Sequence, residues 1–238
     1  MSEESNQAPL RILGQAPLFS DLPESARRVA LDASYRRRLR RGEFFFLQED
    51  PATTFYVLLE GRARLSQLTA DGHQITIRYV APGDAMGIIV ALSDMTYPLS
   101  GEAILDCEAL AWDAGAVKRL MEKYPPLALA GLRLVADRFR HLQERYRELT
   151  TERVERRIAR ALLRLARQTG KRVENGILLD LPLSRQDLGE MTGTTLYTVS
   201  RILSGWEQAS IIATGRERIV ICKPHDLVTI AEDLPADR

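Results

Sequence analysis

The sequence contains few cysteines and no long apolar run. Cys107 and Cys222 stand alone, without a Cys-x-x-Cys pair or a Cys/His ligand spacing around them. Isolated cysteines exclude a disulfide framework and argue against a structural zinc or iron–sulfur site. No apolar stretch approaches the roughly 18 residues that a membrane-spanning helix needs, and the first residues, MSEESNQAPL, are polar and acidic. We therefore expect a cytoplasmic protein with no structural metal and no membrane contact.

The chain also lacks an excess of charge of either sign. Lysine and arginine together number 33 against 32 aspartates and glutamates, so the formal net charge is +1. Binding of nucleic acid by bulk positive charge is thereby excluded, although a local basic face remains compatible with this balance. A glycine-rich phosphate loop and a Ser/His/Asp pattern are missing too, so we expect no enzyme. The 238 residues are enough for two compact domains.

Short β-prone segments fill the chain up to about Asp113. Each has about the usual strand length of five residues or a little more, and turn signals rich in glycine separate them. This rhythm predicts a small antiparallel β-barrel, whose expected strands are FFFLQED, TFYVLLEG, RARLSQLT, QITIRYV and EALAWD. A short helix is expected before the barrel, over residues 18–34, with Ser20 and Asp21 as its cap and Val29 on its inner face.

From Pro125 onward the apolar residues follow alternating steps of three and four. That spacing is the a/d pattern of a coiled coil, and charged residues occupy its flanks. Because one apolar stripe cannot bury itself, we expect a parallel homodimer through the seam Leu132, Val135, Phe139, Leu142, Tyr146 and Leu149. The alternative is a helix packed on its own barrel. A seam of two residues in seven is narrower than the core face of an ordinary globular helix, which favours the dimer.

A separate amphipathic helix is expected over residues 151–168, capped by Thr150 or Thr151 and closed by Gly170. Its predicted core face consists of Val154, Ile158, Leu162 and Leu165. Its other face carries Arg153, Arg156, Arg157, Arg160, Arg164 and Arg167. Charge on an amphipathic helix is usually a solvated face, and we interpret these arginines that way. Phosphate contact by one or two of them is the alternative.

The stretch LSRQDLGEMTGTTLYTVSRIL has the spacing of a helix-turn-helix. Ser184 and Asp187 stand in a capping-box relationship at the start of the first helix, and Gly189 permits a second helix to approach closely. Gly193 can take positive φ in the turn, and a second helix is expected from about Thr195. Its expected buried side chains are Val199, Ile202 and Leu203. With every element of the spacing present, this stretch predicts a DNA-binding motif.

The start of the second helix is the surface expected to enter a major groove of DNA. Arg201 suits a bidentate contact to guanine, and its alternatives are a phosphate contact or an intramolecular ion pair. A hairpin at Asn175-Gly176 precedes the motif, and IIATGRERIVICK follows it as a second hairpin, or wing, turning at Thr214-Gly215. The expected DNA contacts are Ser184, Arg185, Thr194, Thr195, Leu196, Tyr197, Thr198, Ser200, Arg201, Arg216 and Arg218.

The order of barrel, long dimer helix, arginine-rich helix and winged helix-turn-helix resembles the Crp/Fnr family of transcription regulators. The resemblance covers nearly the whole chain, and its motifs are RRGEFFFLQEDPATTFYVLLEGRARL, YVAPGD and LSRQDLGEMTGTTLYTVSRIL. It implies an α+β fold with a jelly-roll sensor domain over 1–123, a dimerisation helix over 124–150 and a winged helix-turn-helix domain over 151–238. It also implies a homodimer that binds an inverted repeat of double-stranded DNA, takes an effector between barrel and dimer helix, and contacts RNA polymerase.

The segment after the Gly83-Asp84 turn departs from the cyclic AMP binders of this family. Ile88 stands where they have a ribose-binding glutamate, and Tyr97-Pro98-Leu99 stand where they have an arginine and its small neighbours. An anionic phosphate buried without a cation is costly, so we expect no cyclic AMP binding. Leu142 and Gln143 stand at the purine positions and make the pocket more apolar. Its expected lining is Met86, Ile88, Ile89, Tyr97, Leu99, Leu142 and Gln143.

The effector is therefore expected to be an apolar ligand or haem, unless the protein is active without one. Fnr-type oxygen sensing needs an N-terminal cysteine cluster, which is missing here. The histidines are His73, His141 and His225, and among them His141 with Met86 is the candidate pair of haem ligands. The alternative for His141 is an exposed helix position.

Tyr197 is a second departure, because many family members have a glutamate there that accepts a hydrogen bond from cytosine. An inverted repeat with an altered half-site is expected. A rival to the DNA-binding function is a ligand-binding barrel that regulates a protein partner through its C-terminal domain. The arginines of the winged motif favour DNA.

Overall fold

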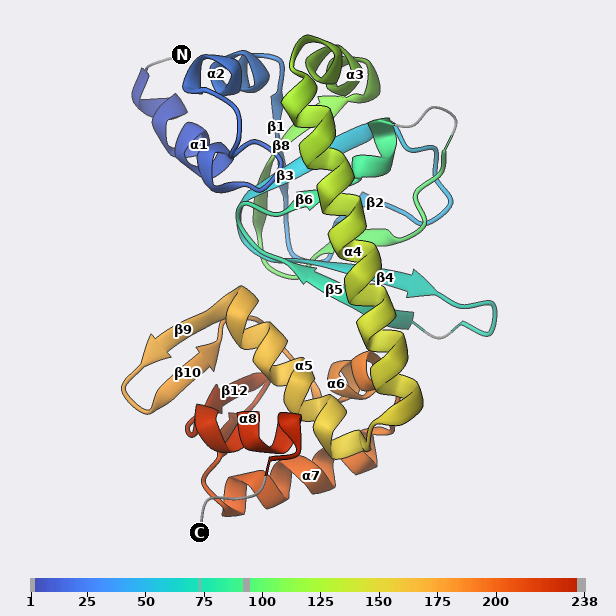
Figure 1. Ribbon diagram of the computed structural model, residues 1–238, viewed down its shortest axis with the longest axis vertical. Coiled ribbons are helices and arrows are strands. Elements are labelled where there is room, and N and C mark those ends of the chain that lie inside the picture. Colours follow the sequence, from blue (N-terminus) through green and yellow to red (C-terminus); the bar gives the residue numbers. More distant parts are fainter. Residues whose placement is uncertain (1–2, 73, 92–94, 235–238) are drawn as a thin grey trace. The chain divides into compact units, whose positions relative to one another are not determined.

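The computed structural model describes residues 3–72, 74–91 and 95–234 (Figure 1). The chain forms two compact units, residues 1–140 and 141–238, and their boundary falls inside the long helix α4 (Pro125–Thr151). From the sequence we expect three parts, divided at residues 123 and 150 by their expected roles in sensing, dimerisation and DNA binding. The two units of the structure are instead defined by packing. The three-part division stays a prediction.

Two four-stranded antiparallel sheets around one core make up the first unit. Their strand orders are β1-β8-β3-β6 and β2-β7-β4-β5. The strands are β1 (Tyr35–Leu39), β2 (Phe44–Phe46), β3 (Thr54–Glu60), β4 (Ala63–Leu68), β5 (Gln74–Val80), β6 (Ala85–Met86), β7 (Ser100–Ala103) and β8 (Cys107–Asp113). The mixed α+β class and the jelly-roll character are confirmed, but the barrel is not closed.

The sequence pattern did not predict three of the described strands, β1, β6 and β7. β6, Ala85–Met86, is too short to show a period, and the four residues of β7, SGEA, are small or polar. β1 has the sequence YRRRL, in which four of five side chains are exposed. Arg36 and Arg38 of this edge strand both pair with Glu108 of the neighbouring β8. Charged side chains are a usual feature of edge strands, since they discourage further strand pairing.

The helices of the first unit close the ends of these sheets. They are α1 (Glu3–Gln15), α2 (Glu24–Asp32), the short 3-10 helix η1 (Ile88–Ala91) and α3 (Ala114–Lys123). Phe19 stacks on the fully buried Trp112 at 5.5 Å, and Trp112 Nε1 donates to the carbonyl of Ala30 at 2.7 Å. The expected helix start was wrong: α2 begins after Pro23, and Val29 is exposed.

The first turns of α4 pack on the sheets, while its predicted seam faces outward. Leu127 and Ala130 belong to the core of the first unit. The six seam residues are all exposed, from 48% for Val135 and Leu149 to 70% for Tyr146. The alternative of a helix packed on its own barrel therefore holds for another face of α4 as far as Arg138, whose Nη2 donates to the carbonyl of Ala85. Among the described residues, no helix combines the length and apolar character needed to cross a membrane.

The second unit contains four helices and a four-stranded sheet. After the end of α4 come α5 (Val154–Thr169), β9 (Gly170–Val173), β10 (Gly176–Leu179), α6 (Arg185–Thr192), α7 (Leu196–Gln208), β11 (Ile212–Gly215), β12 (Arg218–Ile221) and α8 (Pro224–Glu232). The sheet order is β11-β12-β10-β9. The first expected hairpin exists with its turn one residue earlier, because Gly176 already pairs with Val173 in the ladder.

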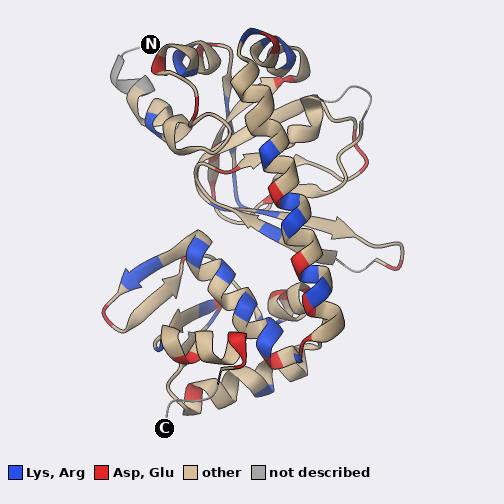
Figure 2. Ribbon diagram, viewed as in Figure 1, with Lys and Arg blue, Asp and Glu red and all other residues tan. Residues whose placement is uncertain are grey.

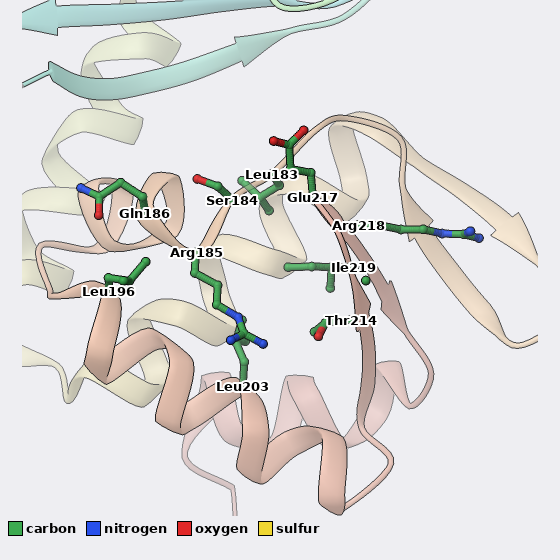
Figure 3. Close-up of a pocket in the computed structure, with 11 residues that line it drawn as sticks. Leu183, Ser184, Arg185, Gln186, Leu196, Leu203, Thr214, Glu217, Arg218 and Ile219 are labelled. Carbon is green, nitrogen blue, oxygen red and sulfur yellow. The ribbon is translucent and has the colours of Figure 1, made fainter.

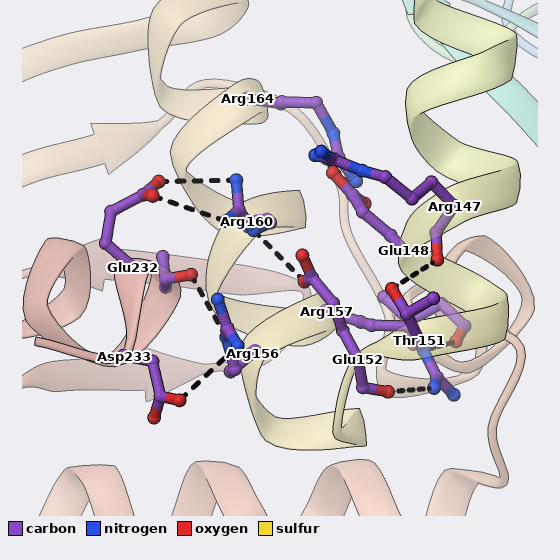
Figure 4. Close-up of polar contacts among 12 residues, drawn as sticks. Arg147, Glu148, Thr151, Glu152, Arg156, Arg157, Arg160, Arg164, Glu232 and Asp233 are labelled. Atoms are coloured by element: carbon purple, nitrogen blue, oxygen red, sulfur yellow. Dashed lines mark hydrogen bonds and ion pairs between the residues drawn. The ribbon is translucent and has the colours of Figure 1, made fainter.

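Basic residues recur along α5 (Figure 2), and three of its arginines, Arg156, Arg160 and Arg164, pair with carboxylates of this unit (Figure 4). Arg164 Nη1 donates to both carboxylate oxygens of the buried Glu148, at 2.7 and 2.9 Å. Arg160 lies between Glu152 and Glu232, with N–O distances of 3.1 and 3.2 Å. The interpretation of a solvated face was therefore wrong for these arginines. They hold α5 to the end of α4 and to α8.

The expected N-cap of α5 was wrong, and its expected C-cap is confirmed. Thr150 and Thr151 donate their hydroxyl hydrogens to carbonyls of α4, the helix that they end. The N-cap of α5 is Arg153, without a side-chain cap bond. Gly170 is the C-cap, as expected, although its backbone is extended.

The turn between α6 and α7 depends on two glycines. Gly193 is left-handed, with φ 61° and ψ 47°, and a Cβ there would lie 2.7 Å from Leu149 Cδ2. A Cβ on the buried Gly189 would lie 2.9 Å from the carbonyl oxygen of Thr194. Arg157 Nε also donates to the carbonyl of Thr192 at 2.9 Å. The close approach of α6 and α7 is thus fixed by backbone geometry, as the sequence predicted.

We expect Gly193→Ala to lower the free energy of unfolding by about 1–2 kcal/mol, since a Cβ is strained in the left-handed region. Gly205→Ala is the matched control, because Gly205 lies inside α7 and its Cβ would meet nothing within 4 Å. This control should raise stability by roughly 0.5–1 kcal/mol. Urea unfolding followed by circular dichroism measures both, and a shift of both variants in the same direction would contradict the prediction.

Candidate functional site

Helix α7 buries one face and leaves the other free. Its N-cap, Thr195, accepts a hydrogen bond from the amide of Thr198 at 3.2 Å. The buried side chains are Val199, Leu203 and Trp206. Ile202 is half-buried, and Trp206, which the sequence pattern missed, donates to Glu155 of α5 at 3.1 Å. The buried face of α7 is therefore packed against the rest of the unit along its length.

The opposite face of α7 is solvent-exposed where DNA contacts were predicted. Tyr197 is 84% exposed, and Thr195, Leu196 and Arg201 are exposed as well. Thr194, Thr198 and Ser200 are half-buried. Within the described parts of the chain Arg201 makes no hydrogen bond or ion pair, so the alternative of an intramolecular ion pair is not supported. Its guanidinium is free to contact a base or a phosphate.

Helix α6 starts beside this face. The capping box is present: the Asp187 amide donates to Ser184 Oγ at 3.0 Å, and the Ser184 amide donates to Asp187 Oδ2 at 2.8 Å. Ser184 Oγ also donates to the same carboxylate, at 2.7 Å. The Ser184 hydroxyl is thus already engaged in the cap. Arg185 is half-buried and points toward α7 (Figure 3).

Strands β11 and β12 form the wing, with a small hollow between it and α6 and α7 (Figure 3). The turn lies at Arg216-Glu217, two residues beyond the expected Thr214-Gly215, because Thr214 and Gly215 still pair with β12. Arg216 and Arg218 are exposed, and Arg218 points away from the hollow. Glu207 of α7 accepts from the Thr214 amide at 3.0 Å and from its hydroxyl at 2.6 Å. These bonds join the wing to α7.

A cavity of about 580 Å³ lies in the first unit. Its walls come from the sheets, from η1, from α3 and from α4. They consist of Phe46, Leu65, Gly87, Ile88, Ile89, Ala91, Tyr97, Pro98, Leu99, Met121, Ala128, Gly131, Leu132, Val135 and Arg138. Of the predicted lining, Ile88, Ile89, Tyr97 and Leu99 are in these walls. Its position agrees with the expected effector pocket.

Three predicted lining residues lie elsewhere. Met86 is fully buried in the core, where it pairs with Tyr56 across β6 and β3, so its assignment to the pocket was wrong. Leu142 and Gln143 are exposed on α4 and are not among the lining residues. Leu132 and Val135, predicted for the seam alone, contribute to the walls as well.

Aromatic stacking shapes one wall of the cavity. The rings of Tyr97 and Phe46 stack at 4.1 Å. The Tyr97 hydroxyl donates to the carbonyl of Thr54 at 2.7 Å and accepts from its amide at 2.9 Å. Burial raises the pKa of Tyr97, so the hydroxyl stays neutral at physiological pH. With both bonds made, this hydroxyl is not available to a ribose or a phosphate.

The proposed haem ligands do not fit a haem site. Met86 has no exposed surface, and an iron would reach its sulfur only if the core opened. His141 is exposed on α4, which was the alternative for this residue. His73 lies outside the described residues. In the described part of the chain, no group of three or more His, Cys, Asp or Glu side chains is placed to hold a metal ion.

Arg138 is the charged one among the lining residues that sequence reasoning missed. Its position on α4 follows Val135 by three residues, and the heptad pattern placed it on a solvated flank. In the structure its Nη2 donates to the carbonyl of Ala85 at 2.7 Å. Burial, together with the neighbouring Arg78, lowers the pKa of Arg138 to about 10. These groups lie on β5, β6 and α4, which are distant in the sequence, and only the fold brings them together.

Comparisons with known proteins agree with this architecture. A family model described as Cyclic nucleotide-binding domain matches residues 36–124, and one described as Crp-like helix-turn-helix domain matches residues 156–230. A Global nitrogen regulator from Nostoc sp. is 28% identical over 188 residues, which are 77% of this chain and 83% of the relative.

Solved structures extend the likeness over both units. A transcriptional regulator of the CRP family from Thermus thermophilus is 30% identical, with a TM-score of 0.69 over 84% of this chain and 100% of the other. FixK2 from Bradyrhizobium japonicum is 26% identical, with a TM-score of 0.72 over 83% of this chain and 96% of the other. With a jelly-roll unit followed by a winged helix-turn-helix, the chain belongs to the Crp/Fnr family, whose members are DNA-binding transcription regulators and not enzymes.

Proposed function

We propose that this regulator acts as a parallel homodimer that reads an inverted repeat of double-stranded DNA with its two copies of α7. The free guanidinium of Arg201, on a helix that is packed on its other face, is the observation that carries the proposal. Arg201 is the candidate for base recognition, and the wing residues Arg216 and Arg218 are candidates for phosphate contact. With DNA and RNA polymerase as its partners, the protein acts in the cytoplasm.

The outward seam of α4 supports the homodimer. Leu132, Phe139 and Tyr146 are 66%, 61% and 70% exposed, which is unusual for large apolar side chains repeated along one helix face. A second copy of the same helix would bury all six seam residues by knobs-into-holes packing. A two-fold dimer would also present α7 twice, which matches an inverted repeat.

The cavity supports an effector other than cyclic AMP. Its walls are apolar except for Arg138 and the satisfied hydroxyl of Tyr97. Ile88, Tyr97 and Leu99 occupy it where cyclic nucleotide binders of the family have polar groups. We therefore propose that this effector has an apolar body that fills the walls by hydrophobic contact.

We expect Arg201→Ala to weaken binding to the specific site by about 5- to 150-fold, the equivalent of one bidentate base contact. Binding to random DNA should change far less. Arg172→Ala is the matched control, because Arg172 is exposed on β9, at the sheet edge opposite the wing. Fluorescence anisotropy at several salt concentrations measures both. Equal affinity of Arg201→Ala and the parent protein, with no salt dependence of the parent, would favour the rival function of regulating a protein partner.

Phe139→Asp should convert the protein to a monomer, since each buried seam side chain contributes on the order of 2 kcal/mol per chain. Arg140→Gln is the control at the adjacent position, whose side chain is exposed and pairs with Asp137. Sedimentation equilibrium gives the oligomeric state, and binding to one half-site and to the full repeat separates folding from dimerisation. A monomeric variant that binds the full repeat as tightly as the parent would argue against the dimer.

Tyr197→Glu tests the altered half-site. A carboxylate at this position only accepts, which suits cytosine N4, whereas a tyrosine hydroxyl both donates and accepts and selects less strictly. We expect selection from random DNA to return a different half-site for the parent protein and for this variant, with cytosine enriched by the variant alone. The same half-site from both proteins would show that Tyr197 does not determine the sequence that is read.

A further inference from the structure

An excess of positive charge lies around Arg138, one of the residues that line the cavity in the first unit. Arg138 of α4 and Arg78 of β5 both donate to the carbonyl oxygen of Ala85, at 2.7 and 3.0 Å. The carboxylate close to them is Asp84, whose Oδ2 lies 3.9 Å from Arg78 Nη1 and also accepts from the Ala81 amide at 2.9 Å. Two guanidiniums thus share one carbonyl and one carboxylate.

Neither guanidinium is fully satisfied. The Nε atoms of Arg78 and Arg138 are buried, and within the described residues neither has a hydrogen-bond acceptor. Burial lowers the pKa of both arginines, and the charge of Arg78 lowers that of Arg138 further. Arg138 remains protonated at neutral pH, because its pKa of about 10 is still well above it. A buried cation with unfilled donors is costly, and an anion beside it would be stabilised.

The rest of the cavity is suited to the apolar part of a ligand. Arg138 is the charged residue among those that line it, and the other walls are aliphatic, aromatic or glycine. The stacked rings of Phe46 and Tyr97 form a flat wall, and Leu132 and Val135 form part of the α4 wall. The volume of about 580 Å³ is within the range of pockets for small organic ligands.

We propose that this cavity binds a small organic acid, with its carboxylate on Arg138 and its apolar body against Phe46, Tyr97 and the α4 wall. The inference deepens the proposed function, because it names the chemical class of the effector. A planar guanidinium matches the two oxygens of a carboxylate. A cyclic nucleotide carries ribose hydroxyls and a polar base as well, and the described lining side chains other than Arg138 and the engaged Tyr97 are apolar. The bound acid contacts Leu132 and Val135, and so reaches the seam directly.

Calorimetry on the full-length protein tests the proposal with two acids and their neutral counterparts. The probes are 4-phenylbutyrate and octanoate, each compared with the alcohol of the same carbon skeleton, together with acetate and cyclic AMP. We expect each acid to bind at least about tenfold more tightly than its alcohol, as one charge-assisted bond requires. Acetate should bind weakly, since it lacks the apolar body. Equal binding of acid and alcohol, no binding of either acid, or tighter binding of cyclic AMP than of both acids would overturn the proposal.

Variants at Arg138 assign the effect to this side chain. Arg138→Met should weaken acid binding about tenfold or more and leave alcohol binding nearly unchanged, while Arg138→Lys, which keeps the charge, should lose less. Arg140→Gln is the control on the same helix, with its side chain exposed and distant from the lining. Thermal unfolding verifies that each variant is folded. Acid affinity unaltered in both Arg138 variants would overturn the assignment.

Binding of the acids and binding of DNA are measured separately, so the two proposals can fail independently. A protein that binds DNA as a dimer but none of the acids contradicts this inference and leaves the proposed function standing. A protein that binds the acids through Arg138 but not DNA contradicts the proposed function and leaves the acid site standing.

Discussion

The turn at Gly193 is the constraint on which the DNA-reading surface depends. Its left-handed backbone sets the direction in which α7 leaves α6, and the Arg157 guanidinium donates to the carbonyls of Thr192 and Gly193 beside it. Trp206 ties α7 to α5, and Glu207 ties it to the wing. With its back fixed at these points, α7 keeps one face free, and a rigid exposed face is what groove recognition requires. Recognition in this chain thus follows from packing behind the helix as much as from the side chains in front of it.

Several arginines of the second unit form ion pairs that hold its helices together and are not exposed for binding. The α5 arginines extend toward Glu148, Glu152 and Glu232, which come from the end of α4, the following linker and α8. Removing one partner of a buried pair costs far more than the pair contributes, so such a network specifies one arrangement of the elements it joins. Arg201, Arg216 and Arg218 are separate from it. A near-neutral chain can therefore present a basic surface, because Arg156, Arg160 and Arg164 of α5 pair with carboxylates of the same unit, whereas the arginines of α7 and the wing stay exposed.

Local rules predicted the helix-turn-helix well and the sensor cavity poorly. The capping box at Ser184, the positive φ of Gly193 and the burial of Val199 each depend on residues a few positions apart, and sequence spacing encodes such relations. β1 was missed because its arginines pair with a strand some seventy residues away, a relation that no local period shows. Arg138 was assigned to a solvated flank for the same reason, since Ala85 and Arg78 meet it only through the fold. Met86 was wrongly assigned to the cavity lining because a strand of two residues is too short for the alternation of buried and exposed side chains to be recognised in the sequence.

The cavity and the seam share two side chains, and this sharing has a thermodynamic consequence. Leu132 and Val135 form part of the cavity walls and also belong to the seam through which we expect two copies to associate. If a ligand in the cavity changes the free energy of seam packing, dimerisation must change the affinity for that ligand by the same factor. Because a dimer gains DNA affinity from binding two half-sites at once, a few kcal/mol of coupling at the seam would alter site occupancy greatly. The first turns of α4, where apolar side chains meet both a ligand space and a partner helix, are thus the part of the chain where an effector signal can become a change in DNA binding.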